Sequence, residues 1–262
     1  MEYGKIILFG DSITEYGGYE SLRFQSKLTD LYTRKLDVVN RGFGGYNSSH
    51  GRVILPRLLE AELNSSKSNI KLMTIFFGSN DASEPVDELS RLQHVPLETY
   101  KLNIRTMVKM AVDNNIKPIV VGPGLNDNRL SRARLMERER RGDVDLATNE
   151  KNHLYSRAAQ EVAQEFGVAF VDLWNLFRIH GNWTQEQLYA STGDSSDDKY
   201  IALGHLFYDG IHFTPAAYEI FTTEVLKAIR SHYPEVWHEN LPQMLPHYSQ
   251  IDPANVEKTI FP

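Results

Sequence analysis

The stretch Lys5-Ile6-Ile7-Leu8-Phe9-Gly10-Asp11-Ser12-Ile13-Thr14 decides the fold. Its apolar run over residues 5–9 is nearly continuous, which is typical of a parallel strand covered by helices on both faces. Gly10 ends the run, and two polar residues follow at the turn. In open α/β sheets, ligands bind beyond the carboxyl ends of the strands. The stretch therefore predicts a buried strand that ends at the binding edge of a sheet.

Four further runs rich in Ile, Val and Phe follow the same pattern, at residues 37–40, 70–77, 116–121 and 168–171. Between the runs, apolar residues at helical spacing predict helices over residues 21–36, 53–63, 97–114, 148–166 and 215–232. Strands that alternate with helices imply right-handed crossovers between parallel strands. We therefore expect an α/β domain over residues 1–232, with a three-layer α/β/α architecture and a doubly wound sheet of about five parallel strands.

Three segments do not fit this alternation. Residues 129–141 hold six Arg and two Glu, and we interpret them as a solvated helical insertion that closes over a site or meets a partner. Residues 182–198 are polar and predict a surface loop. Residues 233–262 hold five of the 11 Pro of the chain, which excludes a long helix. We expect these last residues to form an extended arm, packed on the body or on a partner subunit.

Composition excludes several classes of protein. A net charge of −6 argues against a nucleic-acid surface, and the absence of Cys excludes disulfides and thiolate catalysis. No apolar stretch reaches the roughly 18 residues that a membrane span needs. The apolar run near the start is too short for a signal peptide and lacks a basic leader. We therefore expect a cytoplasmic protein.

Ser12 is the first candidate catalytic residue, because it follows the first strand at the binding edge of the sheet. A serine hydroxyl is a poor nucleophile and needs an adjacent base. Asp209 and His212 supply a base and an acid to orient it, since a spacing of three places both side chains on one side of a turn.

Both assignments have alternatives. Ser12 followed by Glu15 also fits the capping box at the start of a helix. His205, Asp209 and His212 are possible metal ligands, although no dedicated zinc motif accompanies them.

Gly45 and Asn80 are candidate donors to an oxyanion, within the motifs Arg41-Gly42-Phe43-Gly44-Gly45 and Gly78-Ser79-Asn80-Asp81. A glycine lets the backbone N–H approach the substrate closely, and an Asn side chain offers a neutral NH2 group. Both motifs also fit ordinary strand-to-helix loops, where Gly and Asn are common. We expect Asp81 to hold its loop in shape. The chain lacks the G-x-S-x-G elbow of standard α/β-hydrolases.

Taken in order along the chain, these motifs resemble those of the GDSL family of lipases and esterases, in its SGNH-hydrolase form. Ser12, Gly45, Asn80 and His212 match the four residues that give this form its name, and Asp209 matches the acid before the histidine. The resemblance implies a flavodoxin-like fold, a serine nucleophile, and oxyanion donors from Ser12, Gly45 and Asn80. It implies neither a cofactor nor a metal.

The amino-acid sequences of the motifs are similar to those of the isoamyl acetate-hydrolysing esterases of yeasts and plants. Residues 8–15, 40–47, 119–124 and 209–213 carry this likeness. It implies a cytosolic homodimer that hydrolyses short acetate esters. A carbohydrate O-deacetylase or a lysophospholipase on the same scaffold stays open. A catalytically silent scaffold that interacts through the arm is the alternative from a different class.

Overall fold

The computed structural model describes residues 3–19, 21–63, 69–138, 144–194 and 198–261. It contains a five-stranded parallel sheet in the order β2-β1-β3-β4-β5. The strands are β1 (Gly4–Gly10), β2 (Leu36–Gly42), β3 (Ile70–Phe76), β4 (Lys117–Gly122) and β5 (Ala169–Asp172). The order of the strands reverses at β1, with β2 on one side and β3 on the other. The predicted doubly wound sheet is confirmed, and its crevice opens beyond the carboxyl ends of β1 and β3.

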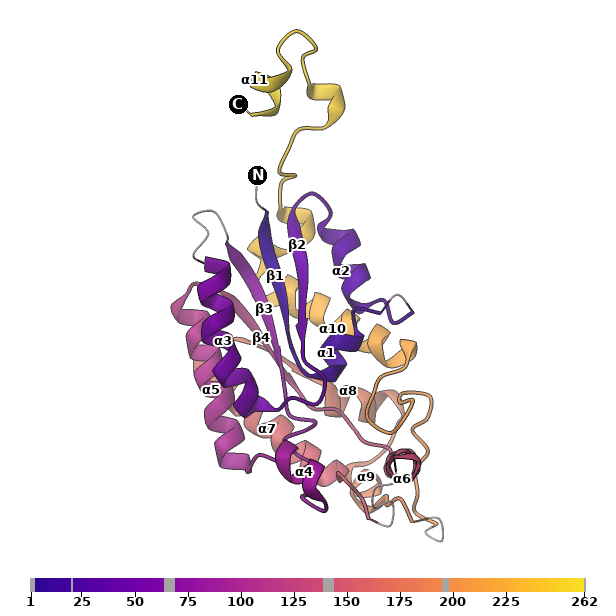
Figure 1. The fold of residues 1–262 in the computed structure, drawn as a ribbon. Helices are drawn as coiled ribbons and strands as arrows, with labels where there is room; N and C mark the ends of the chain where they lie inside the picture. Colours follow the sequence, from indigo (N-terminus) through magenta and orange to yellow (C-terminus); the bar gives the residue numbers. More distant parts are fainter. Residues whose placement is uncertain (1–2, 20, 64–68, 139–143, 195–197, 262) are drawn as a thin grey trace.

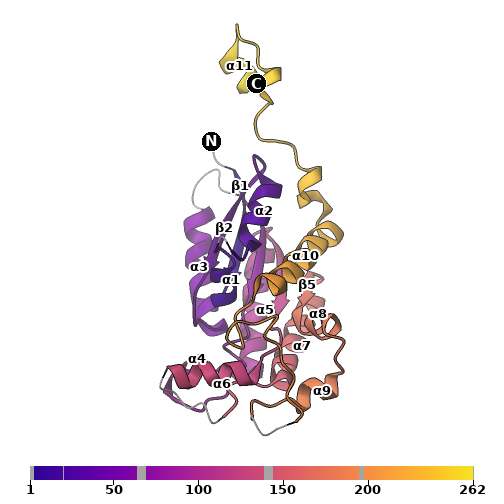
Figure 2. The ribbon, with the colours of Figure 1, turned by 90° about the vertical axis from the view of Figure 1, so that its right-hand side faces the viewer.

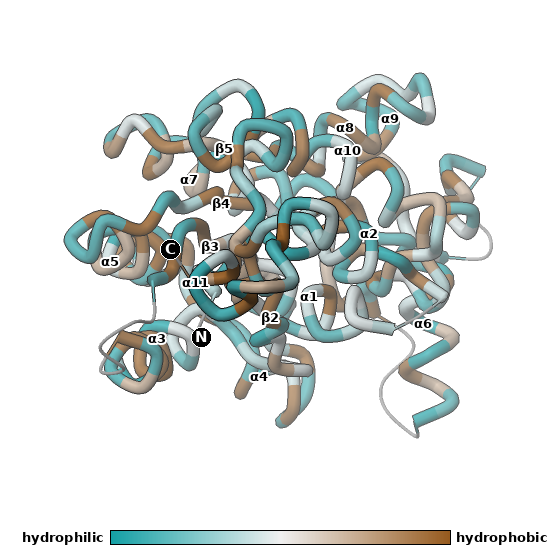
Figure 3. The backbone as a smooth tube through the Cα atoms, turned by 90° about the horizontal axis from the view of Figure 1, so that it is seen from above, coloured by the Kyte–Doolittle hydropathy of each residue, from teal (hydrophilic) through white to brown (hydrophobic). Residues whose placement is uncertain are grey.

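Helices cover both faces of the sheet, which gives the three layers seen in Figures 1 and 3. On one face lie α3 (Ser48–Leu63), α5 (Leu97–Asp113) and α7 (Asn149–Phe166). The other face is covered by α1 (Ser12–Tyr16), α2 (Phe24–Tyr32), α8 (Leu173–His180) and α10 (Pro215–His232).

Strand β1 explains why both faces are covered. Ile6 and Leu8 join the apolar cluster under α2, α8 and α10, whereas Ile7 and Phe9 join the cluster under α3, α5 and α7. All four side chains have 0% exposure, and burial of each contributes about 1.5–3 kcal/mol to folding. The nearly continuous apolar run thus has a direct physical reason.

Two predicted helices have the wrong bounds. The helix predicted over residues 21–36 ends at Tyr32, because Arg34 adopts a left-handed φ of 63° and Leu36 already begins β2. The helix predicted from residue 53 begins earlier, at Ser48, whose backbone N–H donates to the buried carboxylate of Asp81 at 3.0 Å.

Three short helices lie in segments for which we expected a loop, expected a helical insertion, or made no assignment. These are α4 (Glu88–Gln93), α6 (Asn128–Glu137) and α9 (Gln185–Ala190). The prediction of a loop over residues 182–198 is wrong where α9 lies, because Thr184 and Gln187 form a capping box. The insertion predicted over residues 129–141 is helical up to Glu137, and its last three residues lie outside the described part of the chain.

The arm begins on the body and then leaves it at the end of the sheet where the strands start (Figures 1 and 2). Tyr233 and Val236 belong to the apolar core, and Arg34 donates to the carbonyls of Leu245 and Pro246 at 2.9 and 3.0 Å. The described part of the arm contains three short 3-10 turns and α11 (Val256–Ile260). A contact between this arm and a partner subunit stays a prediction. No helix among the described residues is long and apolar enough to cross a membrane.

Candidate active site

The connections after β1, β2 and β3 bring Ser12, Gly45 and Asn80 to the same edge of the sheet. Ser12 is the first residue of α1, where a backbone N–H has no partner within the helix. The N-cap is Asp11, whose side chain accepts from the N–H of Ile13 at 2.9 Å. The alternative role of Ser12 as an N-cap is therefore wrong, and its hydroxyl is available for other contacts.

A chain of hydrogen bonds links Ser12 to residues about 200 positions away. The Oγ atom of Ser12 lies 2.9 Å from Nε2 of His212, and Nδ1 of His212 lies 2.7 Å from Oδ2 of Asp209. The backbone N–H of His212 donates to Oδ1 of the same aspartate at 3.0 Å, which fixes the turn between them. The structure thus brings together the three residues that the sequence singled out, in the geometry of a nucleophile, a base and an orienting acid.

Asp209 also pairs with a residue that the sequence analysis missed. Nη1 of Arg134 in α6 lies 3.2 Å from Oδ2 of Asp209, and the Arg134 side chain is only 11% exposed. Burial alone raises the pKa of Asp209, but the hydrogen bond with His212 and the charges of His212 and Arg134 together lower it well below its usual range. Asp209 therefore stays ionised, and the basic run at residues 129–141 is not wholly a solvated face.

Helix α6 packs directly against the turn that carries Asp209 and His212. The N–H of Asp127 donates to the carbonyl of Gly210 at 2.9 Å. Gly210 has a φ of 93°, and a Cβ atom there would lie 2.2 Å from Oγ of Ser131, so only glycine fits. The pairing of Arg134 with Asp209 spans 75 residues, which no local spacing reveals.

The surroundings of His212 and His205 do not match the alternative in which both residues and Asp209 bind a metal ion. Tyr16 of α1 packs on the imidazole, with 4.7 Å between the ring centroids. The ring of His205 stacks on that of His180, with 6.0 Å between the ring centroids. Within the described residues, no group of three His, Cys, Asp or Glu side chains is arranged to hold a metal ion.

The two further donor candidates lie in the loops after β2 and β3. Gly45 has a φ of 78°, which strains any residue with a side chain. The Asn80 side chain, in a residue only 9% exposed, donates from Nδ2 to the carbonyl of Tyr46 at 2.8 Å. The loops of Gly45 and Asn80 are therefore joined to each other through this bond.

Two buried carboxyl groups lie at this edge of the sheet, Asp11 before Ser12 and Asp81 after Asn80. Burial raises the pKa of Asp81 and of Asp11 to about 7, and the charge of Asp81 adds to the effect on Asp11. Asp81 accepts from Ser48 through both carboxylate oxygens, and its carbonyl accepts from the N–H of Val95 at 3.1 Å. These contacts agree with the expected role of Asp81 in shaping its loop.

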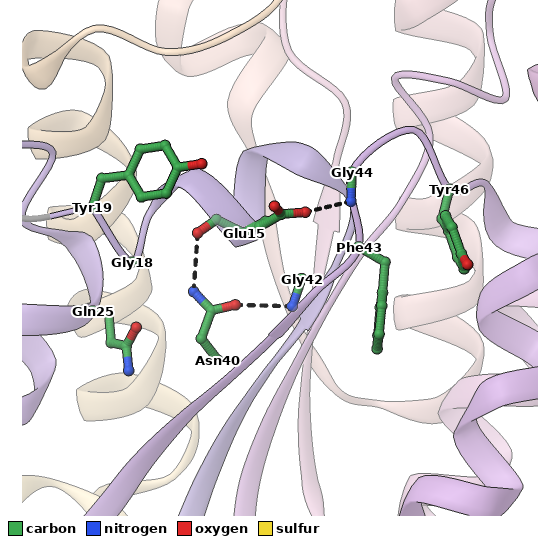
Figure 4. Close-up of a pocket in the computed structure, with 9 residues that line it drawn as sticks. All are labelled: Glu15, Gly18, Tyr19, Gln25, Asn40, Gly42, Phe43, Gly44 and Tyr46. Carbon is green, nitrogen blue, oxygen red and sulfur yellow. Dashed lines mark hydrogen bonds between the residues drawn. The ribbon is translucent and has the colours of Figure 1, made fainter.

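A hollow of about 550 Å³ lies between α1 and the end of β2 (Figure 4). Its lining residues are Glu15, Gly18, Tyr19, Gln25, Asn40, Gly42, Phe43, Gly44 and Tyr46. The carboxylate of Glu15 accepts from the N–H of Gly44 at 2.5 Å, and a Cβ atom at Gly44 would lie 4.0 Å from Cβ of Ser12. Gly44 in the wall of the hollow therefore lies close to Ser12, and the walls are both polar and aromatic.

A second, small cavity borders the site on the inner side. It has room for about one water-sized group, about 10 Å³. Ile13, Ser79 and Ile211 line it, and each is a neighbour in sequence of Ser12, Asn80 or His212. Phe213 lines this cavity, whereas Phe43 and Tyr46 line the outer hollow.

Comparisons with known proteins identify a family for this chain. Residues 8–220 match the profile of the GDSL-like Lipase/Acylhydrolase family. The isoamyl acetate-hydrolyzing esterase of Saccharomyces cerevisiae is 34% identical over 269 aligned positions, which cover 98% of this chain and 99% of the yeast protein. A GDSL esterase/lipase of Arabidopsis thaliana is 32% identical, over 97% of this chain and 96% of the plant protein.

Solved structures are similar in fold. A catalytic mutant of the acetylxylan esterase Axe2 from Geobacillus stearothermophilus has a TM-score of 0.60 at 20% identity, covering 87% of this chain and 96% of that one. TesA has a TM-score of 0.55 at 20% identity and covers 86% of this chain and 98% of its own.

Proposed function

This chain belongs to the GDSL-like lipase/acylhydrolase family and is a carboxylic ester hydrolase, and we propose that it cleaves short acetate esters such as isoamyl acetate through an acyl-enzyme on Ser12. The observation that carries the proposed reaction is the chain of hydrogen bonds from Ser12 through His212 to Asp209. The name of the yeast relative supports the proposed substrate class.

In the proposed first half-reaction, Oγ of Ser12 attacks the ester carbonyl while Nε2 of His212 takes its proton. Asp209 accepts from Nδ1–H and keeps Nε2 as the basic nitrogen of the imidazole. The backbone N–H groups of Ser12 and Gly45 and the amide of Asn80 stabilise the oxyanion. His212 then returns the proton to the departing alcohol.

In the second half-reaction, His212 removes a proton from water, and the resulting hydroxide attacks the acyl-enzyme. The carboxylic acid leaves as Ser12 regains its proton. Removal of Ser12 or His212 is expected to lower kcat by roughly 10⁴–10⁶, since residues of such a triad act as a unit. Removal of one oxyanion donor is expected to lower kcat by roughly 10²–10³.

The small inner cavity supports an acyl group of acetyl size. The space beside Ile13 and Ile211 is about the size of one water molecule, so it leaves no room for a long acyl chain. The outer hollow is much larger and open, so we assign it to the alcohol part of the ester. Because one methylene changes binding by only about 1–3 kcal/mol, several short alcohols are expected to serve.

The proposal is tested by following isoamyl acetate hydrolysis with titration of the acetic acid released, for the wild-type protein and Ser12→Ala. Incubation with a fluorophosphonate and mass spectrometry of the labelled peptide identifies the nucleophile. Activity lost in Ser12→Ala together with a label on Ser12 supports the proposal. Full activity in Ser12→Ala contradicts it.

A carbohydrate O-deacetylase is the second candidate, and the lining of the outer hollow favours it. Glu15, Gln25 and Asn40 bring polar groups to this hollow, and Tyr19 and Phe43 bring aromatic rings. Such a mixture suits a leaving group with several hydroxyls. Comparison of kcat/KM for an acetylated xylooligosaccharide and for isoamyl acetate separates the two candidates, because each predicts a preference for its own substrate.

A further inference from the structure

Gln93 at the end of α4 contacts both loops that carry the proposed oxyanion donors. Its Nε2 atom donates to the carbonyl of Gly45 at 3.2 Å and to Oδ1 of Asn80 at 3.2 Å. An NH2 group has two hydrogens, so this single amide bonds to one acceptor in each loop.

The partners of the Gln93 and Asn80 amides leave only one orientation for each. The carbonyl of Gly45 only accepts, so the nitrogen of Gln93 must face it rather than the oxygen. The carbonyl of Tyr46 also only accepts, so Nδ2 of Asn80 faces Tyr46 and its Oδ1 faces Gln93. Within the described part of the chain, Tyr46 supplies the one acceptor for Nδ2, which leaves its second hydrogen for a ligand.

The backbone around Gln93 is held in place as well. Its carbonyl accepts from Nδ2 of Asn47 at 2.9 Å. Two positions later, the N–H of Val95 donates to the carbonyl of Asp81, the residue after Asn80. Nδ1 of His94 lies 3.0 Å from the same carbonyl. The end of α4 is therefore docked on the loop that carries Asn80, and Gln93 is fixed before any substrate binds.

We infer that Gln93 is a positioning residue that holds the Gly45 loop and the Asn80 amide in the orientation which stabilises the oxyanion. This inference rests on the proposed function. Donors that are already oriented stabilise charge in the transition state without reorganising during the reaction. Gln93 acts through Asn80 and Gly45, so its loss is expected to lower kcat and to leave KM almost unchanged.

The test compares Gln93→Met and Gln93→Glu with Asn80→Ala, Ser12→Ala and the wild-type protein, using p-nitrophenyl acetate. Met keeps the length of the side chain and removes the donors. Glu places an acceptor against the carbonyl of Gly45 and attracts Nδ2 of Asn80, which turns the Asn80 amide around. Gln164→Glu, at an exposed position in α7, is the matched control for the added charge.

We expect kcat to be highest in the wild-type protein, lower in Gln93→Met and lowest in Gln93→Glu. Loss of one donor is expected to lower kcat roughly tenfold in Gln93→Met. Reversal of the Asn80 amide is expected to bring Gln93→Glu to the level of Asn80→Ala, roughly 10²–10³ below wild type. In the Asn80→Ala background, Gln93→Met is expected to cost less than about threefold more, because part of its effect runs through Asn80.

Three results overturn the inference. One is wild-type kcat in Gln93→Glu while Ser12→Ala is inactive, which rejects the role of Gln93 and leaves the proposed function intact. Another is a full tenfold loss from Gln93→Met in the Asn80→Ala background, which indicates independent, structural effects. Wild-type activity in Ser12→Ala rejects the proposed function and this inference together. Melting temperatures of all variants show whether a loss of kcat follows a loss of folding.

Discussion

Gly42→Ala is expected to disable the enzyme by moving the helix that carries Ser12. Gly42 is the last residue of β2 and pairs with Gly10 of β1. A Cβ atom at Gly42 would lie 2.0 Å from the backbone N of Glu15 and 2.4 Å from its Cα. These are backbone atoms of α1, so no side-chain rotation relieves the clash.

The size of the movement follows from these distances. Ordinary contact begins at 3.4 Å, so α1 and β2 must separate by 3.4 − 2.0 = 1.4 Å. Ser12 lies in the same short helix, and its Oγ is 2.9 Å from Nε2 of His212. Even about 1 Å of movement takes this pair beyond hydrogen-bond distance. A displacement of that size costs roughly 10²-fold in kcat, and the overpacking costs about 1–3 kcal/mol of stability.

The assay is kcat for p-nitrophenyl acetate together with the melting temperature. Gly44→Ala is the control in the same motif, because the closest atom to its Cβ is Oε2 of Glu15 at 3.0 Å, at the end of a flexible side chain. The reasoning is refuted by a Gly42→Ala protein whose kcat stays within about threefold of wild type at an unchanged melting temperature.

Three further predictions concern charge, pH and assembly. Arg134→Gln removes the cation beside Asp209 and is expected to move the acidic limb of the kcat/KM profile up by about one pH unit. Arg132→Gln is the control, because it breaks an ion pair with Asp145 and is expected to leave the acidic limb in place. An unmoved limb in Arg134→Gln contradicts this. Burial raises the pKa of Asp81 to about 7, so the folded state binds a proton that the unfolded state has lost, and stability falls as pH rises from 5 to 7. Asp81→Asn is expected to flatten this fall in the free energy of unfolding, measured by urea titration between pH 5 and 7. An equal slope with pH in the wild-type and Asp81→Asn proteins argues against this prediction. If the arm forms a dimer contact, deletion of residues 247–262 is expected to yield a monomer, as measured by light scattering. The deletion spares the core residues Tyr233 and Val236. An unchanged mass rejects the arm as the dimer contact.

The sequence predicted the sheet because each strand is buried on both faces and therefore apolar along its length. Residues 6–9 are the clearest case, since alternate side chains enter two different cores. The end of α2 was harder to predict, because the left-handed conformation of Arg34 is not favoured by its residue type. The capping box at Thr184 and Gln187 was present in the sequence, but the polar composition around it favoured a loop.

The candidate site divides in the same way. Ser12, Asn80 and His212 stand in local motifs, and the topology of the sheet brings those motifs together. Arg134 and Gln93 act through pairings with Asp209 and Asn80 that depend on how α6 and α4 pack. No spacing in the sequence encodes these pairings, because they depend on tertiary structure.

Hydrolysis of p-nitrophenyl acetate, butyrate, octanoate and palmitate by the wild-type and Ser12→Ala proteins tests the central claim most directly. We predict activity that is high on acetate, falls steeply with chain length, and drops by roughly 10⁴–10⁶ in Ser12→Ala. Equal activity on palmitate and acetate contradicts the assignment of the small inner cavity to the acyl group. Activity that persists in Ser12→Ala contradicts the account as a whole.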